Sequence, residues 1–147
     1  MKTRVLLVDD EKHFVELLAE RLALRGYDVE TTLSGEEAVD KIEHYNYDVI
    51  ILDVAMPGMD GVETLREIKR RKPLIEVIML TGHATVESAV EGMKLGALDY
   101  VMKPCDMEDL VLKIETAREK KAKKEESLRQ DKVRKILSSP RSVLKEE

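Results

Sequence analysis

The chain has 147 residues, of which 43% are hydrophobic and 37% are charged, and its formal net charge is −5. This length allows one domain with a substantial core and a short extension. No apolar stretch approaches the roughly 20 residues that a membrane span requires. A single cysteine excludes an internal disulfide, and the first residues lack the pattern of a secretory signal. We therefore expect a cytoplasmic protein without membrane association.

The charge is unevenly distributed along the chain. Residues 1–117 hold 24 acidic and 14 basic residues, whereas residues 118–147 hold 6 acidic and 11 basic residues. An acidic body disfavours broad binding to nucleic acids. No helix-turn-helix pattern accompanies the basic tail, so direct DNA binding is not expected either.

The first half of the chain alternates strand-like runs with helical spacing. Residues 5–8 and 49–52 are continuous apolar runs, which are typical of parallel strands covered by helices on both faces. Residues 27–32 predict a short strand between them. The first helix should stop at Gly26, and a capping box beginning at Ser34 predicts the start of the second.

The second half repeats this alternation. A third helix should end before Pro73, because the residue before a proline disfavours helical backbone. Residues 77–80 and 100–102 predict two further strands, with a fourth helix closed by Gly96 between them. Asp106 is placed to cap a fifth helix.

Five strand–helix units predict an α/β fold built on a parallel sheet with right-handed crossovers. After Arg118 apolar residues become sparse, while good helix formers remain abundant. We therefore expect one domain over residues 1–120. Residues 121–147 should form a charged C-terminal extension, first prolonging the fifth helix and then disordered, with the Ser138-Ser139-Pro140 sequence ending the helix.

Reactive side chains follow four of the apolar runs. Asp9 and Asp10 follow the first, Asp53 the third, Thr81 the fourth and Lys103 the fifth. Ligands of open α/β sheets bind outside the carboxyl ends of the strands, so these side chains should meet at one edge. Each alone is commonly a helix cap or a solvated group. Their shared position at the same end of different strands favours a site.

This set of side chains suits a divalent cation and a phosphoryl group. Asp10 and Asp53 are natural direct ligands of Mg²⁺ or Mn²⁺, while Asp9 either binds through water or maintains the geometry. Asp53 is the best candidate nucleophile for an aspartyl phosphate, because it stands alone at a strand end. Lys103 would supply a second positive charge and Thr81 a hydroxyl donor.

Several motifs together resemble the receiver domain of two-component response regulators, in particular those of nitrogen-regulator-type transcription activators. The resemblance covers about residues 3–120. The matching segments are Val8-Asp9-Asp10-Glu11, Asp53-Val54-Ala55-Met56-Pro57-Gly58-Met59-Asp60-Gly61, Thr81-Gly82-His83, Gly96-Ala97 and Lys103-Pro104. It implies a flavodoxin-like, doubly wound sheet of five parallel strands in the order 2-1-3-4-5, with five helices.

The resemblance also implies roles for individual residues. Asp53 would accept phosphate from a phosphohistidine on a sensor histidine kinase or a histidine phosphotransfer protein. The backbone carbonyl of Ala55 would join the metal ligands, and Lys103 would contact the phosphoryl group. Thr81 and Tyr100 would form the switch that a downstream target protein recognises. Phosphorylation-dependent formation of a homodimer is also compatible with the resemblance. The Lys103-Pro104 peptide bond should be cis.

The sequence leaves two kinds of signalling protein open and disfavours two other functions. The chain could be a self-contained phosphorylated switch, or the N-terminal receiver portion of a longer DNA-binding transcription regulator whose fifth helix continues into a dimerising linker. An aspartate-nucleophile phosphatase would need a second Asp two residues after Asp53, where Ala55 stands. Nucleotide binding is disfavoured because no P-loop follows the first strand. We expect no enzyme activity beyond self-phosphorylation and self-dephosphorylation.

Overall fold

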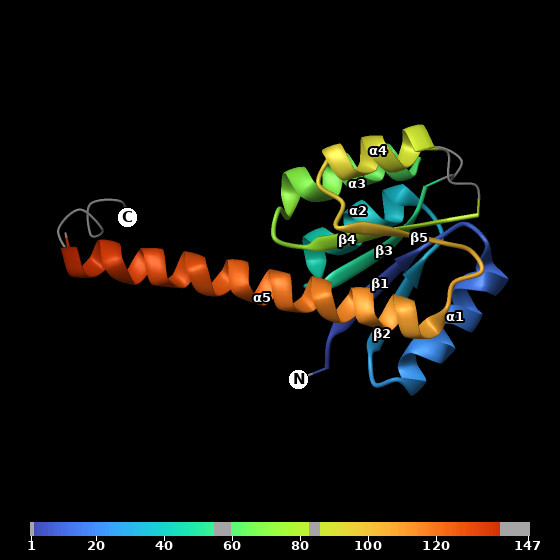
Figure 1. Cartoon of the computed structure of the whole chain (residues 1–147), viewed down its shortest axis with the longest axis horizontal. Coiled ribbons are helices and arrows are strands. Elements are labelled where there is room, and N and C mark those ends of the chain that lie inside the picture. Colours follow the sequence, from blue (N-terminus) through green and yellow to red (C-terminus); the bar gives the residue numbers. More distant parts are fainter. Residues whose placement is uncertain (1, 55–59, 83–85, 139–147) are drawn as a thin grey trace.

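The computed structural model of the chain describes residues 2–54, 60–82 and 86–138, and in these ranges strands alternate with helices (Figure 1). The strands are β1 (Arg4–Val8), β2 (Asp28–Thr32), β3 (Val49–Asp53), β4 (Glu76–Thr81) and β5 (Asp99–Met102). The helices are α1 (Lys12–Leu24), α2 (Gly35–His44), α3 (Gly61–Arg71), α4 (Val86–Lys94) and α5 (Met107–Ser138).

All neighbouring strands of the sheet pair in parallel, in the order β2-β1-β3-β4-β5. Helices α1 and α5 cover one face, and α2, α3 and α4 lie on the other (Figure 1). Successive strand residues point to opposite faces, so Val5 and Leu7 join one core cluster while Leu6 and Val8 join the other. The expected doubly wound α/β fold and its strand order are therefore confirmed.

The residues expected to begin or end helices lie at the helix ends. The Glu37 backbone N–H donates to Ser34 Oγ at 3.2 Å, which caps α2. Helix α1 gives way to a turn at Gly26, whose φ of +95° is the left-handed conformation that glycine adopts without steric cost. Asp106 accepts from the backbone N–H of Glu108 at 3.2 Å at the start of α5.

The helical extension at the C-terminus is present, and its first part lies against the body. Helix α5 continues without interruption to Ser138 and projects beyond the sheet (Figure 1). Lys121 forms an ion pair with Asp48 at 3.3 Å, and Lys124 forms one with Glu76 at 2.6 Å. These contacts attach two turns of α5 beyond residue 117 to the ends of the sheet where β3 and β4 begin.

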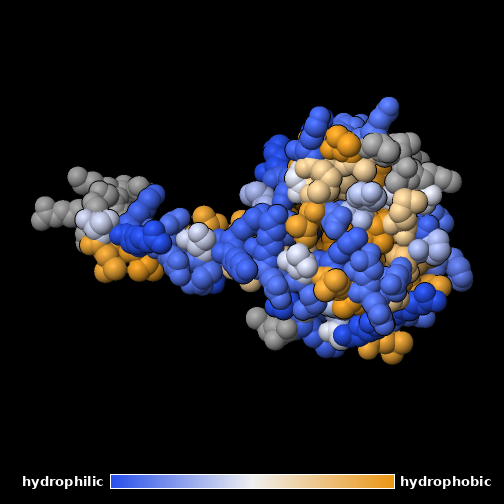
Figure 2. Space-filling view, in the orientation of Figure 1, coloured by the Kyte–Doolittle hydropathy of each residue, from blue (hydrophilic) through white to orange (hydrophobic). Residues whose placement is uncertain are grey.

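Within the described part of the chain, no helix combines the length and the apolar character that crossing a bilayer would demand. Most of the surface visible in Figure 2 is hydrophilic. Helix α5 illustrates this: its 32 residues include many charged side chains, and Leu110, Ile114 and Ala117 are its buried positions.

Candidate functional site

The carboxyl ends of the strands bring three aspartates together. One carboxylate oxygen each from Asp9, Asp10 and Asp53 lies within 4.8 Å of the others. Asp9 and Asp53 are only 3% and 4% exposed, whereas Asp10 is exposed. The grouping arises because β1 and β3 are adjacent and parallel, so their ends reach the same edge.

Lys103 closes one side of this cluster. Its Nζ lies 2.5 Å from Asp9 Oδ2 and 3.9 Å from Asp53 Oδ2, and its side chain is 13% exposed. Burial by itself would lower the pKa of Lys103, but its contacts with Asp9 and Glu11 and the charge of Asp53 outweigh this and raise it. The lysine therefore remains a cation beside the three aspartates.

Backbone hydrogen bonds hold the loops that present these side chains. The Asp9 N–H donates to Thr32 O at 3.2 Å, and the Glu11 N–H donates to Asp9 Oδ1 at 3.0 Å. This local turn directs Asp9 inward and leaves Asp10 exposed. The Lys103 N–H donates to Thr81 O at 2.8 Å, and the Lys103-Pro104 peptide bond is cis, as expected.

Thr81 lies at the same edge of the sheet as the aspartates, whereas Tyr100 lies two residues before the end of its strand. Thr81 ends β4 and is 3% exposed, in register with Met102 of β5. Tyr100 is 40% exposed and lies beside α4, where Ala89, Val90 and Met93 help to line the same hollow. Ala55, expected to offer a backbone carbonyl, lies outside the described residues.

Two residues near the site were not assigned a role from the sequence. Glu11 Oε1 accepts from Lys103 Nζ at 3.0 Å, and the Phe14 ring centroid lies 4.4 Å from the same Nζ. Glu11 directly follows the aspartate pair, a signal that could have suggested a fourth acid at the site. Phe14 fits the helical apolar spacing of α1, which conceals its cation–π contact with Lys103.

Gly61 allows the β3–α3 connection to approach Asp53. A Cβ atom at Gly61 would overlap the Asp53 carbonyl oxygen and the Val54 backbone. The Gly61 N–H donates to Val54 O at 2.9 Å. A larger residue at this position would push the start of α3 away from the end of β3 and move the Asp53 backbone with it.

The chemistry of these side chains fits a hard divalent cation. Carboxylate oxygens are the ligands that Mg²⁺ prefers, and one or two carboxylates are its usual share from the protein. Three adjacent carboxylates repel one another, and Lys103 offsets only one of the charges. The Lys103 ammonium lies within contact distance of both buried aspartates.

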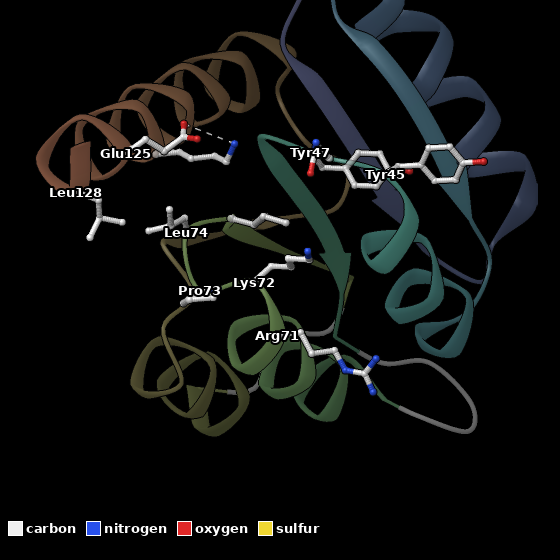
Figure 3. A pocket seen from close by; sticks show the side chains of 11 residues that line it. Tyr45, Tyr47, Arg71, Lys72, Pro73, Leu74, Glu125 and Leu128 are labelled. Atoms are coloured by element: carbon white, nitrogen blue, oxygen red, sulfur yellow. Dashed lines mark ion pairs between the residues drawn. The ribbon is translucent and has the colours of Figure 1, made fainter. Parts of the chain in front are cut away.

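A separate cavity of about 360 Å³ lies at the opposite edge of the sheet (Figure 3). Its walls come from the segments before β3 and β4 and from α5, including Tyr45, Pro73, Leu74 and Leu128. The Lys121–Glu125 ion pair of α5 borders it. None of the expected site residues that the structure describes lines this cavity, so it is distinct from the aspartate cluster.

Comparisons with known proteins identify relatives of the chain. A family model described as response regulator receiver domain matches residues 5–115. The chain is 40% identical over 113 residues to the transcriptional regulatory protein ZraR of Escherichia coli (strain K12), covering 77% of this chain and 26% of ZraR. It is 36% identical over 123 residues to the regulatory protein AtoC of the same organism, covering 84% and 27%. The chain thus spans about a quarter of the length of these relatives.

Solved structures show the same similarity. A response regulator receiver domain protein (CheY-like) from Methanospirillum hungatei JF-1 superimposes with a TM-score of 0.81 at 31% identity, covering 84% of this chain and 99% of that one. NtrX from Brucella abortus superimposes with a TM-score of 0.81 at 32% identity, covering 88% of this chain and 30% of NtrX. The chain belongs to the response regulator receiver domain family.

Proposed function

We propose that Asp53 is the phosphoryl acceptor of this receiver, taking its phosphoryl group from a phosphohistidine of a sensor histidine kinase or a histidine phosphotransfer protein. The observation that carries the proposal is the position of Asp53, buried at the end of β3 beside two further aspartates and the Lys103 ammonium. A carboxylate oxygen of Asp53 attacks phosphorus, and the phosphorus–nitrogen bond of the donor breaks. The imidazole leaves with the electron pair and is protonated by water.

The remaining side chains neutralise and orient charge during this transfer. Asp10 and Asp53 would hold Mg²⁺ or Mn²⁺ directly, Asp9 would act indirectly, and the Ala55 carbonyl would complete the protein ligands. When bound, the cation would neutralise charge on the phosphoryl oxygens. Lys103 would supply a second positive charge, and Thr81 would donate its hydroxyl. The chain acts as a switch and catalyses only its own phosphorylation and dephosphorylation.

The signal would leave the site through Thr81 and Tyr100. Thr81 moves toward the phosphoryl group, and Tyr100 turns inward into the vacated space, shifting the balance between two conformations. A hollow of about 460 Å³ lined by Ala89, Val90, Met93, Lys94 and Tyr100 supports this face as the surface read by a downstream protein. Because Tyr100 is one of its walls, turning this ring inward changes the shape of the hollow.

A second candidate is the N-terminal receiver portion of a longer, cytoplasmic transcription regulator. ZraR and AtoC are regulatory proteins of which the chain matches about a quarter. Figure 2 shows hydrophobic surface toward the far end of α5, where Val133, Ile136 and Leu137 are exposed. These exposed apolar side chains favour a division into a receiver domain over residues 1–120 and a segment over residues 121–147 that pairs with a second copy of the chain.

The proposal is tested by labelling the wild-type chain with a small-molecule phosphodonor and Mg²⁺. We expect one phosphate per chain, stable in acid and labile in base, as an acyl phosphate is. A chelator should prevent labelling, because the three aspartates then repel the donor. An acid-labile, base-stable label would instead indicate a histidine, and the absence of any label would contradict the proposal.

Lys103→Ala is expected to separate metal binding from the response. The variant should bind Mg²⁺ at least as tightly as the wild type, because the competing ammonium is gone, but it should lose the conformational change. The measurement is the ¹⁹F resonance of fluorotyrosine at Tyr100, assigned with Tyr100→Phe, before and after addition of a phosphoryl mimic. Lys12→Ala, which removes an exposed lysine of α1, is the matched control. A normal shift in Lys103→Ala would contradict its role.

A further inference from the structure

The Lys103 ammonium is shared by carboxylates that differ sharply in exposure. Asp9 lies 2.5 Å away with its side chain 4% exposed, and Asp53 lies 3.9 Å away with its side chain 6% exposed. Glu11 lies 3.0 Å away, yet its side chain is 65% exposed. Glu11 is therefore the partner of Lys103 that water can replace at least cost.

Glu11 is turned toward Lys103 instead of serving its own helix. It occupies the N-cap position of α1, where side chains commonly accept hydrogen bonds from the first helical N–H groups. Its side chain makes no such bond. Its carboxylate instead reaches a residue 92 positions away in the sequence. The contact depends on the tertiary fold and sits at the exposed side of the aspartate cluster.

We propose that Glu11 is a positioning residue, which holds Lys103 in the unphosphorylated state and competes with the phosphoryl group for its ammonium. The inference rests on the proposed phosphorylation of Asp53. Lys103 Nζ is 3.9 Å from Asp53 Oδ2, beyond hydrogen-bond distance, so it must turn toward a group bound there. The Glu11 backbone N–H donates to Asp9 Oδ1, which fixes the Asp9 carboxylate in place. The exposed Glu11 carboxylate is the one that exchanges.

Competition between Glu11 and the phosphoryl group for Lys103 should weaken binding of a phosphoryl mimic by a modest factor. Exposed ion pairs contribute little because water screens them, so releasing Lys103 from Glu11 should strengthen binding of a phosphoryl mimic about two- to fivefold. The effect should shrink at high ionic strength, where exposed charges are screened further. A carboxylate that instead merely stabilised the fold would leave this binding constant unchanged.

The test compares Glu11→Gln, Glu11→Asp and the control Glu16→Gln in the full chain. Glu16 is an exposed acid of the same helix, whose nearest basic partner is Lys12 at 3.9 Å. Beryllofluoride with Mg²⁺ is the probe. We expect a two- to fivefold lower half-saturating concentration in Glu11→Gln and no change in Glu16→Gln. Glu11→Asp keeps the charge but shortens the reach, so it should resemble Glu11→Gln if direct contact matters.

Two further measurements exclude a general charge effect. In the Lys103→Ala background, Glu11→Gln should change beryllofluoride affinity by less than in the wild type, because the competed-for group is absent. In the metal-free protein, the ¹⁵N ammonium resonance of Lys103 should shift in Glu11→Gln and not in Glu16→Gln. If Glu11→Gln changes neither the beryllofluoride affinity nor the Lys103 resonance, the inference about Glu11 is overturned. The proposed function still stands in that case, provided that the wild-type chain is labelled at Asp53. A wild-type chain that neither takes label nor binds beryllofluoride overturns both.

Discussion

Asp53→Asn should reduce labelling by a small phosphodonor to below about 1% of the wild-type level, since an amide oxygen is a poor nucleophile at the position where the chemistry requires a carboxylate. Asparagine has nearly the same shape, so the packing at the end of β3, where Asp53 is 4% exposed, should be preserved. The measurement is base-labile phosphate per chain by intact mass, with the labelled peptide mapped in the wild type.

The control for this variant is Asp40→Asn, which neutralises an exposed carboxylate of α2 that is not part of the aspartate cluster. It should label like the wild type. Equal labelling of Asp53→Asn would rule out Asp53 as the acceptor. Mapping would then show whether Asp9 or Asp10, the neighbouring carboxylates, takes the phosphate instead.

Lys124→Met should destabilise the fold by about 1–3 kcal/mol. Glu76 begins β4 with its side chain 1% exposed, and Lys124 Nζ contacts its Oε1 at 2.6 Å. Removing one partner of a buried ion pair leaves an uncompensated charge, which typically costs about 3–5 kcal/mol. The lower range applies here because the Lys124 side chain is 38% exposed. The measurement is the free energy of unfolding in urea, with an unchanged m-value.

Matched variants identify the source of this loss. Lys123→Met removes the neighbouring, exposed lysine of α5 and should be within about 0.5 kcal/mol of the wild type. Adding Glu76→Gln to Lys124→Met should recover most of the stability, because the unpaired Glu76 carboxylate is then gone. If Lys124→Met is as stable as the wild type, the Lys124–Glu76 contact contributes nothing to the fold.

This result bears directly on the proposed division at residue 120. Lys121 and Lys124 bind Asp48 and Glu76, at the edge of the sheet opposite the aspartate cluster. A destabilised Lys124→Met would mean that the receiver fold uses α5 beyond residue 120. The free extension would then begin after Leu128, which still lines the cavity beside the sheet.

Local pattern was sufficient to predict most of the fold and to place the aspartates and Lys103 at one edge of the sheet. Continuous apolar runs indicated buried strands, and Ser34 and Gly26 marked helix ends, because these signals depend on near neighbours and on the periodicity of burial. Once parallel strands were expected, Asp9, Asp53 and Lys103 had to reach the same edge. Strand direction accounts for the shared edge, and the adjacency of β1 and β3 brings Asp9 and Asp53 close together.

Which charged side chains pair across the molecule depends on how the chain folds. The Glu11–Lys103 and Glu76–Lys124 contacts join residues 92 and 48 positions apart. Glutamate and lysine at such positions are ordinarily solvated, so neither periodicity nor composition distinguishes a paired charge from a free one. Burial patterns repeat along the chain and can be read locally, whereas an ion pair exists only where the folded backbone brings two distant side chains together.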